Sequence, residues 1–269
     1  MTNSTETEQA KGLGRRTFLR GVAALAGTAA GAATAIRASA SVDRDVVQPL
    51  PETHNDALVA SADRAVAQTL YGKVRGFIRH GIYSFKGVPY GASTAGEGRF
   101  TPPQRPEPWP GVRSSLHYGL IAPQDKGTGR LHDESAFIFQ WNDSVAGEDC
   151  LRVNVWTPGI KDAGQRPVMV WLHGGGFVAG SGHDLPAFDG ENLARRGDVV
   201  VVTLNHRLNL LGYLDLSDYG SEYAASGNVG MLDIVAALEW VRDNIAEFGG
   251  DPNRVTIFGQ SGGGAKVSA

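Results

Sequence analysis

Two uninterrupted apolar runs in the second half of the chain restrict its fold more than any other feature. Residues 168–172 read VMVWL, and residues 199–204 read VVVVTL. A strand that is apolar at nearly every position must be covered on both of its faces, as happens in sheets that lie between layers of helices. We therefore expect both runs to be strands inside such a sheet.

A helix and a further strand follow these runs. The apolar residues at helical spacing within 230–248 are Ile234, Leu238, Val241 and Ile245. They predict an amphipathic helix, which Gly249 and Gly250 can end in the left-handed conformation. Residues 251–253 then turn the chain into a strand at 255–258. Because strands and helices alternate, we expect an α/β fold with a mostly parallel central sheet.

The first half has a different pattern. From Thr69 onwards, short apolar clusters are separated by Gly72, Gly76, Gly81 and Gly87. This spacing predicts a small N-terminal layer of antiparallel strands. The polar stretch 41–66 is expected to be a surface lead-in to a domain at 67–269. The proline-rich stretch 102–110 is interpreted as a structural crossover, because Trp109 needs burial; a PxxP peptide ligand is the alternative.

Composition and charge exclude several classes of function. The chain has 36 Gly and 13 Pro, which argues against a helical bundle. Beyond residue 40 it carries 20 Lys and Arg against 26 Asp and Glu, without a basic stripe, so nucleic-acid binding is not expected. One cysteine and seven histidines without metal-ligand spacing give no reason to expect a metal or another cofactor.

The first 40 residues resemble a twin-arginine export signal. Arg15 and Arg16 precede the uncharged stretch 21–36, and the small residues at 38–40 fit a signal-peptidase site. The stretch is too short and too weakly apolar to span a bilayer, so no stable membrane anchor is expected. We expect the Tat export machinery as a partner and a periplasmic or extracellular location. A basic amphipathic or disordered head is the alternative.

A serine in a glycine-rich turn is the candidate nucleophile. Residues 259–263 read GQSGG and directly follow the expected strand at 255–258. A GxSxG match is weak alone in a chain so rich in glycine, but a strand running into it is the context of a nucleophile elbow. Ser261 would then lie in a sharp turn, where Gly259 and Gly263 must lack side chains.

A second glycine-rich turn offers an oxyanion hole. Residues 173–177 read HGGGF and follow the strand at 168–172, so their backbone N–H groups can turn inward without a Cβ in the way. Gly175, Gly176 and Gly262 would then donate to the negative charge that develops on an attacked carbonyl oxygen. His173 is interpreted as a loop-supporting residue. A glycine-rich turn without a ligand is the alternative.

Several motifs together resemble type-B carboxylesterases, the family of the cholinesterases and para-nitrobenzyl esterases. Residues 147–156 read GEDCLRVNVW and are similar to the EDCLxLNVW signature of that family. Further matches are FKGVPYG from Phe85, GRFTPP from Gly98, HGGGF from His173, VVVVTLNHRL from Val199, GNVGMLD from Gly227 and FGGDPNRVTIFGQSGGG from Phe248. The resemblance covers 69–264 and implies an α/β-hydrolase fold. It also implies hydrolysis of small-molecule carboxylic esters through an acyl-enzyme on Ser261.

The chain departs from the family pattern after the nucleophile. In this fold the catalytic acid and histidine follow the serine, but only eight residues follow Ser261, and none is acidic or a histidine. We therefore expect the N-terminal part of an esterase, truncated after the nucleophile elbow and almost inactive by itself. If the base lay upstream, the candidates would be His173, His183 and His206.

The resemblance carries further structural expectations. Family members pair the cysteine of the EDCL motif with an upstream cysteine, where this chain has Ala122. Cys150 should therefore be unpaired and have a structural role. The resemblance also places Arg99 near Glu148, and Arg207 near Asp233, as partly buried ion pairs.

Two alternatives for function stay open. A catalytically silent, cholinesterase-like binding domain would share the fold, but such relatives are expected to lose the nucleophile or the oxyanion glycines. An amidase or another acyl-transfer enzyme could use the same machinery.

Overall fold

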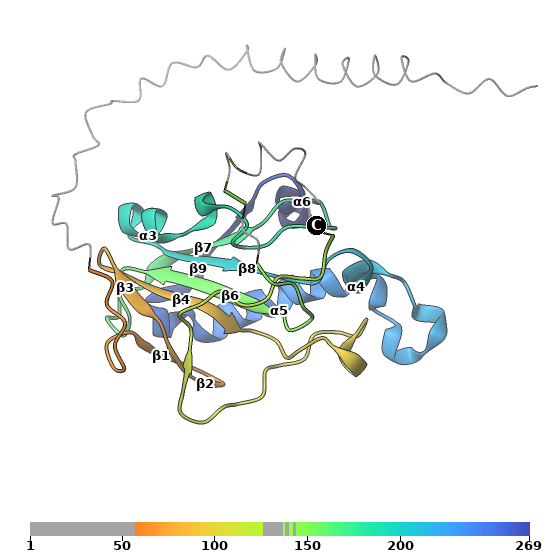
Figure 1. Ribbon diagram of the computed structural model, residues 1–269, viewed down its shortest axis with the longest axis horizontal. Coiled ribbons are helices and arrows are strands. Elements are labelled where there is room, and N and C mark those ends of the chain that lie inside the picture. The colour runs from red at the N-terminus through yellow and green to blue at the C-terminus, as the bar shows by residue number, and fades with distance from the viewer. Residues whose placement is uncertain (1–56, 126–136, 138–139, 142–143) are drawn as a thin grey trace, which may run out of the picture. The chain divides into compact units, whose positions relative to one another are not determined.

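The computed structural model describes residues 57–125, 137, 140–141 and 144–269 (Figure 1). The expected export signal at 1–40 and most of the expected lead-in at 41–66 lie outside these residues. Among the residues that are described, no helix has the length and apolar character needed to cross a membrane.

A six-stranded sheet forms the centre, with the strand order β3-β4-β6-β8-β7-β9. Its strands are β3 (Phe77–Arg79), β4 (Ile82–Pro89), β6 (Arg152–Thr157), β7 (Arg166–Leu172), β8 (Val200–Leu204) and β9 (Gly250–Gly259). The pairs β3/β4, β4/β6 and β6/β8 are antiparallel, whereas β7/β8 and β7/β9 are parallel. The expectation of a mostly parallel sheet is therefore wrong, and the sheet is mixed. Apolar runs report burial, whereas strand direction depends on how each pair is connected.

A second, three-stranded sheet has the strand order β1-β2-β5. Its strands are β1 (Val66–Thr69), β2 (Gly72–Arg75) and β5 (Val112–Ser114). The expected antiparallel pairing is confirmed for β1 and β2, but β5 joins β2 in parallel. β1 begins at Val66, and an isolated bridge joins Val59 to Ile78, so strand pairing begins before Thr69.

The proline-rich crossover is fixed to this small sheet by Trp109. The indole Nε1 donates to the carbonyl oxygen of Lys73 at 2.9 Å, and the ring fills the space that a Cβ on Gly72 would need. Trp109 is half-buried and packs against the core. The structural interpretation of residues 102–110 therefore agrees with the fold.

The helices are α3 (Glu191–Gly197), α4 (Asn209–Tyr213), α5 (Val229–Asn244) and α6 (Gly262–Ser268). Short 3-10 helices are η2 (Gly96–Gly98), η3 (Pro186–Phe188), η4 (Ser217–Tyr219), η5 (Ser221–Tyr223), η6 (Ser226–Asn228) and η7 (Ile245–Phe248). The expected amphipathic helix is confirmed as α5 and its continuation η7. Gly249 ends it with a φ of 73°, which is the left-handed conformation that favours glycine.

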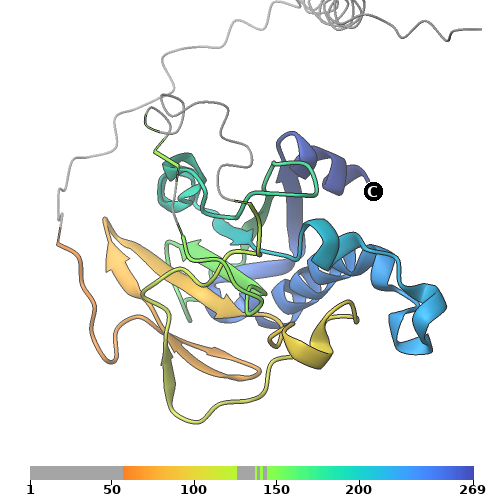
Figure 2. The same ribbon diagram turned by 45° about the vertical axis from the view of Figure 1, so that its right-hand side comes forward.

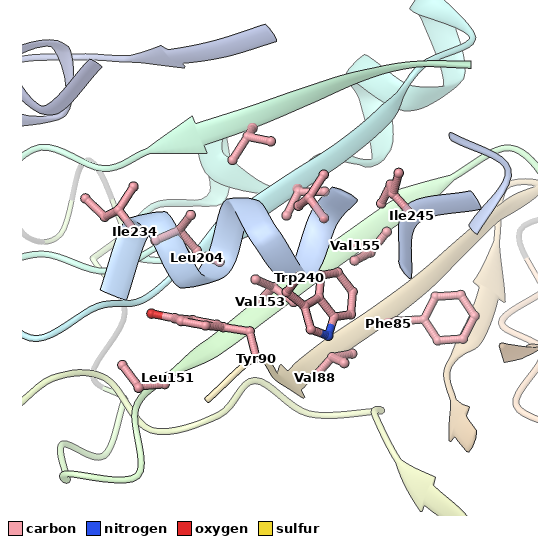
Figure 3. Packing of buried hydrophobic residues seen from close by; sticks show 14 of the residues in the cluster. Phe85, Val88, Tyr90, Leu151, Val153, Val155, Leu204, Ile234, Trp240 and Ile245 are labelled. Atoms are coloured by element: carbon pink, nitrogen blue, oxygen red, sulfur yellow. The ribbon is translucent and has the colours of Figure 1, made fainter. Parts of the chain in front are cut away.

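Both faces of the central sheet are covered, as the apolar runs predict. In β8, Val200, Val202 and Leu204 pack in the cluster that contains α5, whereas Val201 packs in the cluster that contains Ala194 of α3. The two helices lie on opposite sides of the sheet in Figure 1 and in the rotated view of Figure 2. Figure 3 shows Trp240 of α5 among apolar side chains of β4 and β6.

The Arg207–Asp233 pair is the buried ionic contact at the end of β8. Arg207 donates from Nε and Nη2 to the two carboxylate oxygens at 2.9 and 2.6 Å. Its Nη1 donates to the carbonyl oxygen of Thr101 at 2.8 Å. The two side chains are only 2% and 0% exposed. Burial raises the pKa of Asp233, and the guanidinium of Arg207 opposes that rise.

The second expected pair also forms, but it is not buried to the same extent. Arg99 contacts Glu148 with Nη2–Oε1 and Nε–Oε2 distances of 2.5 and 2.6 Å. The Arg99 side chain is 51% exposed, so water screens the pair. The expected partial burial is therefore found for Glu148, whose side chain is 17% exposed, whereas Arg99 is mostly at the surface.

Cys150 is a free thiol in the core. It is completely buried in the same apolar cluster as Ala122. Burial raises its pKa to about 12, so the reactive thiolate is scarce near neutral pH. This environment agrees with a structural role.

We predict that Arg207→Met lowers the free energy of unfolding by about 3–5 kcal/mol, because it leaves the Asp233 carboxylate buried without a partner. The double variant Arg207→Met/Asp233→Leu should recover much of this loss. Urea unfolding measures the free energy of unfolding of both variants. Arg99→Met is the matched control and should change stability much less. An Arg207→Met variant as stable as the wild type would contradict the prediction.

Candidate active site

Ser261 occupies a sharp turn between β9 and α6. Its φ and ψ are 56° and −124°, a combination that non-glycine residues rarely adopt, and its side chain is exposed. Backbone strain of this kind collects at functional sites, where the surrounding structure holds it. The expected strand-to-helix turn at Ser261 is therefore confirmed in its geometry.

Gly259 and Gly263, two residues before and after Ser261, lie where backbone segments are in direct contact. A Cβ on Gly259 would lie 2.5 Å from the carbonyl carbon of Gly263. A Cβ on Gly263 would collide with the carbonyl oxygen of Leu172 and lie 2.9 Å from that of His173. The GxSxG spacing thus follows from the close packing of α6 against the ends of β9 and β7.

The HGGG turn lies directly beside Ser261. In the parallel pairing of β7 with β9, Leu172 is opposite Gly259, so residues 173–177 leave the sheet next to the nucleophile turn. A Cβ on Gly174 would lie 3.5 Å from the Cβ of Ser261. The structure therefore brings together the two glycine-rich turns that the sequence predicts to act together.

The proposed oxyanion donors are neighbours. Gly175 and Gly176 have φ values of 85° and 64°, and within the described part of the chain their N–H groups donate to no other group. Gly262 is the first residue of α6, so its N–H has no acceptor inside the helix. A Cβ on Gly262 would lie 2.5 Å from the Cα of Gly176. Free N–H groups at such a place can bind developing negative charge.

His173 supports this turn from inside the protein. It is buried, and its Nδ1 donates to the carbonyl oxygen of Gly174 at 2.8 Å. Burial, together with the charge of Lys266, lowers its pKa to about 3, so it is neutral near pH 7. Its ring stacks on that of His206 at 5.0 Å, and burial also lowers the pKa of His206 well below its ordinary value. This agrees with the loop-supporting interpretation of His173.

His183 lies in different surroundings. Its ring stacks on Tyr118 at 4.3 Å, and its Nε2 is 3.0 Å from Oγ of Ser144. Burial lowers its pKa to about 4. It lines a cavity of about 450 Å³ that Ser261 and the glycine turns do not line. Between Ser261 and the described histidines there is no hydrogen bond.

Three polar side chains that hold the HGGG turn and the loop after it were not predicted from the sequence. Gln124 accepts from the N–H of Gly180 at 2.8 Å and donates to its carbonyl oxygen at 3.1 Å. Asn205 accepts from the N–H of Gly182 at 2.8 Å. Lys266 is 4% exposed, and its Nζ donates to the carbonyl oxygen of His173 at 3.3 Å. Only Lys266 had a local signal, as a charged residue in the glycine-rich run after Ser261.

Metal ligation has no support in the described residues, where no group of three or more His, Cys, Asp or Glu side chains could hold an ion. The site is instead made of one hydroxyl and backbone N–H groups, with buried polar side chains behind them. A hydroxyl and free N–H donors are two of the parts that acyl transfer through a serine requires, and a base is the third.

The chain belongs to the carboxylesterase family, whose family model matches residues 63–269. The resemblance to type-B carboxylesterases is thereby confirmed. Para-nitrobenzyl esterase of Bacillus subtilis is 44% identical over 204 residues, which are 76% of this chain and 40% of that protein. Fumonisin B1 esterase of Sphingopyxis macrogoltabida is 38% identical over 257 residues, covering 95% of this chain and 42% of that protein.

A solved esterase from Clostridium hathewayi, which can hydrolyse aliphatic aromatic polyesters, has a similar fold. Its TM-score is 0.72 at 47% identity, over 79% of this chain and 41% of that chain. The chain thus spans about 40% of the length of these relatives.

We predict that Gly263→Ala lowers the free energy of unfolding by about 1–3 kcal/mol or more, because the added methyl group has no room beside Leu172. Gly264→Ala is the matched control. A Cβ there would be 3.6 Å from the nearest atom, and alanine favours the helix by about 0.5–1 kcal/mol. Chemical denaturation should therefore move the two variants in opposite directions. Equal stability of the two variants would disprove the close packing.

Proposed function

We propose that this chain is the nucleophile-bearing part of a serine carboxylic-ester hydrolase. One observation carries the proposal: Ser261 is held in a strained strand-to-helix turn directly beside the N–H groups of Gly175 and Gly176, for which the described residues offer no acceptor. Membership of the carboxylesterase family supports it. Among the relatives, para-nitrobenzyl esterase and fumonisin B1 esterase are named for the esters they act on.

The proposed reaction has two steps. Oγ of Ser261 attacks the ester carbonyl carbon while a base takes the hydroxyl proton. The carbonyl oxygen becomes negative and accepts from the N–H groups of Gly175, Gly176 and Gly262. When the tetrahedral intermediate collapses, the alcohol leaves with a proton and an acyl-serine remains. Water then attacks the acyl-serine, which releases the carboxylic acid and restores Ser261.

The base is proposed to lie outside these 269 residues. His173 and His206 are buried, with lowered pKa values and their Nδ1 atoms bonded to carbonyl oxygens. His183 lines the separate cavity. We infer that the full-length protein supplies a histidine and an acidic residue downstream of Ser261, in the order of this fold.

A catalytically silent binding domain is the competing proposal. It would have no use for a serine in a strained turn, and it would not need neighbouring N–H groups that have no acceptor in the described part of the chain. Both features are present, so the esterase is favoured. The substrate class proposed is a small-molecule carboxylic ester; an amidase would use the same groups on a different bond.

We also propose export by the twin-arginine route to the periplasm or the extracellular space. The adjacent Arg15 and Arg16, the uncharged stretch and the cleavage pattern support it. The alignment with fumonisin B1 esterase covers 95% of the chain and so includes part of the proposed signal.

A fluorophosphonate probe tests the proposed function. In the full-length protein it should label Ser261 and block the hydrolysis of aryl esters, and Ser261→Ala should abolish labelling. The 269-residue chain should be labelled far more slowly, because removal of the base leaves only the smaller rate enhancement from the oxyanion hole and binding. Equal labelling of both chains would mean that an upstream histidine is the base. Full-length protein that hydrolyses no aryl ester and takes no label would overturn the esterase.

Export is tested by replacing both arginines with lysine. The Arg15→Lys/Arg16→Lys variant should stay in the cytoplasm with residues 1–40 uncleaved, because the twin-arginine pair identifies the signal to the Tat machinery. Immunoblotting of cell fractions measures this. Unchanged secretion of the variant would point to the general secretory route instead.

A further inference from the structure

Lys266 joins α6, the helix that begins directly after Ser261, to the oxyanion turn, which is the HGGGF segment at residues 173–177. It lies on α6, five residues after Ser261, and is 4% exposed. Its Nζ donates to the carbonyl oxygen of His173 at 3.3 Å and lies 5.5 Å from the ring centroid of Phe177. His173 and Phe177 flank the three glycines of the turn. One ammonium group therefore contacts both ends of the segment that carries two oxyanion donors.

Stability does not explain this lysine. A buried ammonium group is costly unless an anion pairs with it, and among the described residues no carboxylate forms a salt bridge with Lys266. Burial is the cause that lowers its pKa to about 8. The ionisable groups against it are His173 and His206, whose pKa values its charge lowers further. A well-packed apolar side chain would cost less at this position.

We propose that Lys266 is a positioning residue that fixes the oxyanion turn against the helix of Ser261. The inference rests on the proposed esterase function. The hydrogen bond to His173 holds the start of the turn, and the contact with Phe177 holds its end. A displacement of about 1 Å between nucleophile and donors can cost about 100-fold in rate, so such a contact matters for the reaction.

Because Lys266 carries a titratable charge, its role should be visible in the pH dependence of kcat. A fixed cation near the turn favours the negative charge that develops in the transition state. The ammonium group loses its proton as pH rises through about 8. His173 and His206 are already neutral there, because their pKa values lie far lower. We therefore expect kcat of the wild type to fall above about pH 8.

The test uses Lys266→Met in the full-length protein. We expect kcat for an aryl ester to fall about 10- to 100-fold while KM changes much less. The fall of kcat above pH 8 that Lys266 causes should disappear, and the unfolding midpoint in urea should stay the same or rise, because the buried charge is removed. Lys266→Arg keeps the cation, so it should retain more activity than Lys266→Met without the step near pH 8. Lys73→Met, an exposed lysine of β2, is the matched control and should behave as wild type.

A second measurement does not depend on activity. Amide hydrogen exchange at Val178 and Ala179, whose N–H groups close the turn by donating to the carbonyl oxygen of Gly175, should become at least about 10-fold faster in Lys266→Met, while exchange in β6 stays unchanged. If the wild type hydrolyses no ester, the proposed function fails, and the exchange data alone decide whether Lys266 holds the turn. The inference is overturned if Lys266→Met has wild-type exchange in the turn. It is also overturned if kcat falls only in step with a loss of stability.

Discussion

The close approach of two backbone turns at the ends of β7 and β9 is the constraint on which the site depends. Leu172 and Gly259 are opposite each other in the sheet, and the turns that follow leave no space for side chains at Gly259 or Gly263. This contact is possible only where both turns are rich in glycine. The strain at Ser261 persists because the packing of β9, α6 and β7 leaves the backbone no easier path.

Buried polar side chains hold the loops around this contact. Arg207 joins Asp233 of α5 to the carbonyl oxygen of Thr101, and Gln124 forms paired hydrogen bonds with Gly180 just beyond the HGGG turn. Hydrogen bonds of this kind, from the buried Arg207 and the half-buried Gln124, restrain the loops that they join. The backbone N–H groups of Gly175 and Gly176, which have no acceptor among the described residues, can therefore still be fixed in place.

Arg207 and Lys266 are both buried cations, but their partners differ. Arg207 is balanced by Asp233, so each charge compensates the burial of the other. Lys266 has a carbonyl oxygen and an aromatic ring as partners, and burial lowers its pKa to about 8. A buried charge without a carboxylate partner among the described residues costs stability, and this cost supports the proposed positioning role of Lys266.

The sequence by itself determined the buried strands, the amphipathic helix and the turn at Ser261, because periodicity and glycine spacing are local properties of the chain. The ordered motifs also identified the family. Only the tertiary structure decided that the sheet is mixed, that Arg207 is buried while Arg99 is half exposed, and that Lys266 reaches His173. Strand direction depends on long connections, and burial depends on which distant segments cover a side chain. A local sequence pattern therefore predicts neither property.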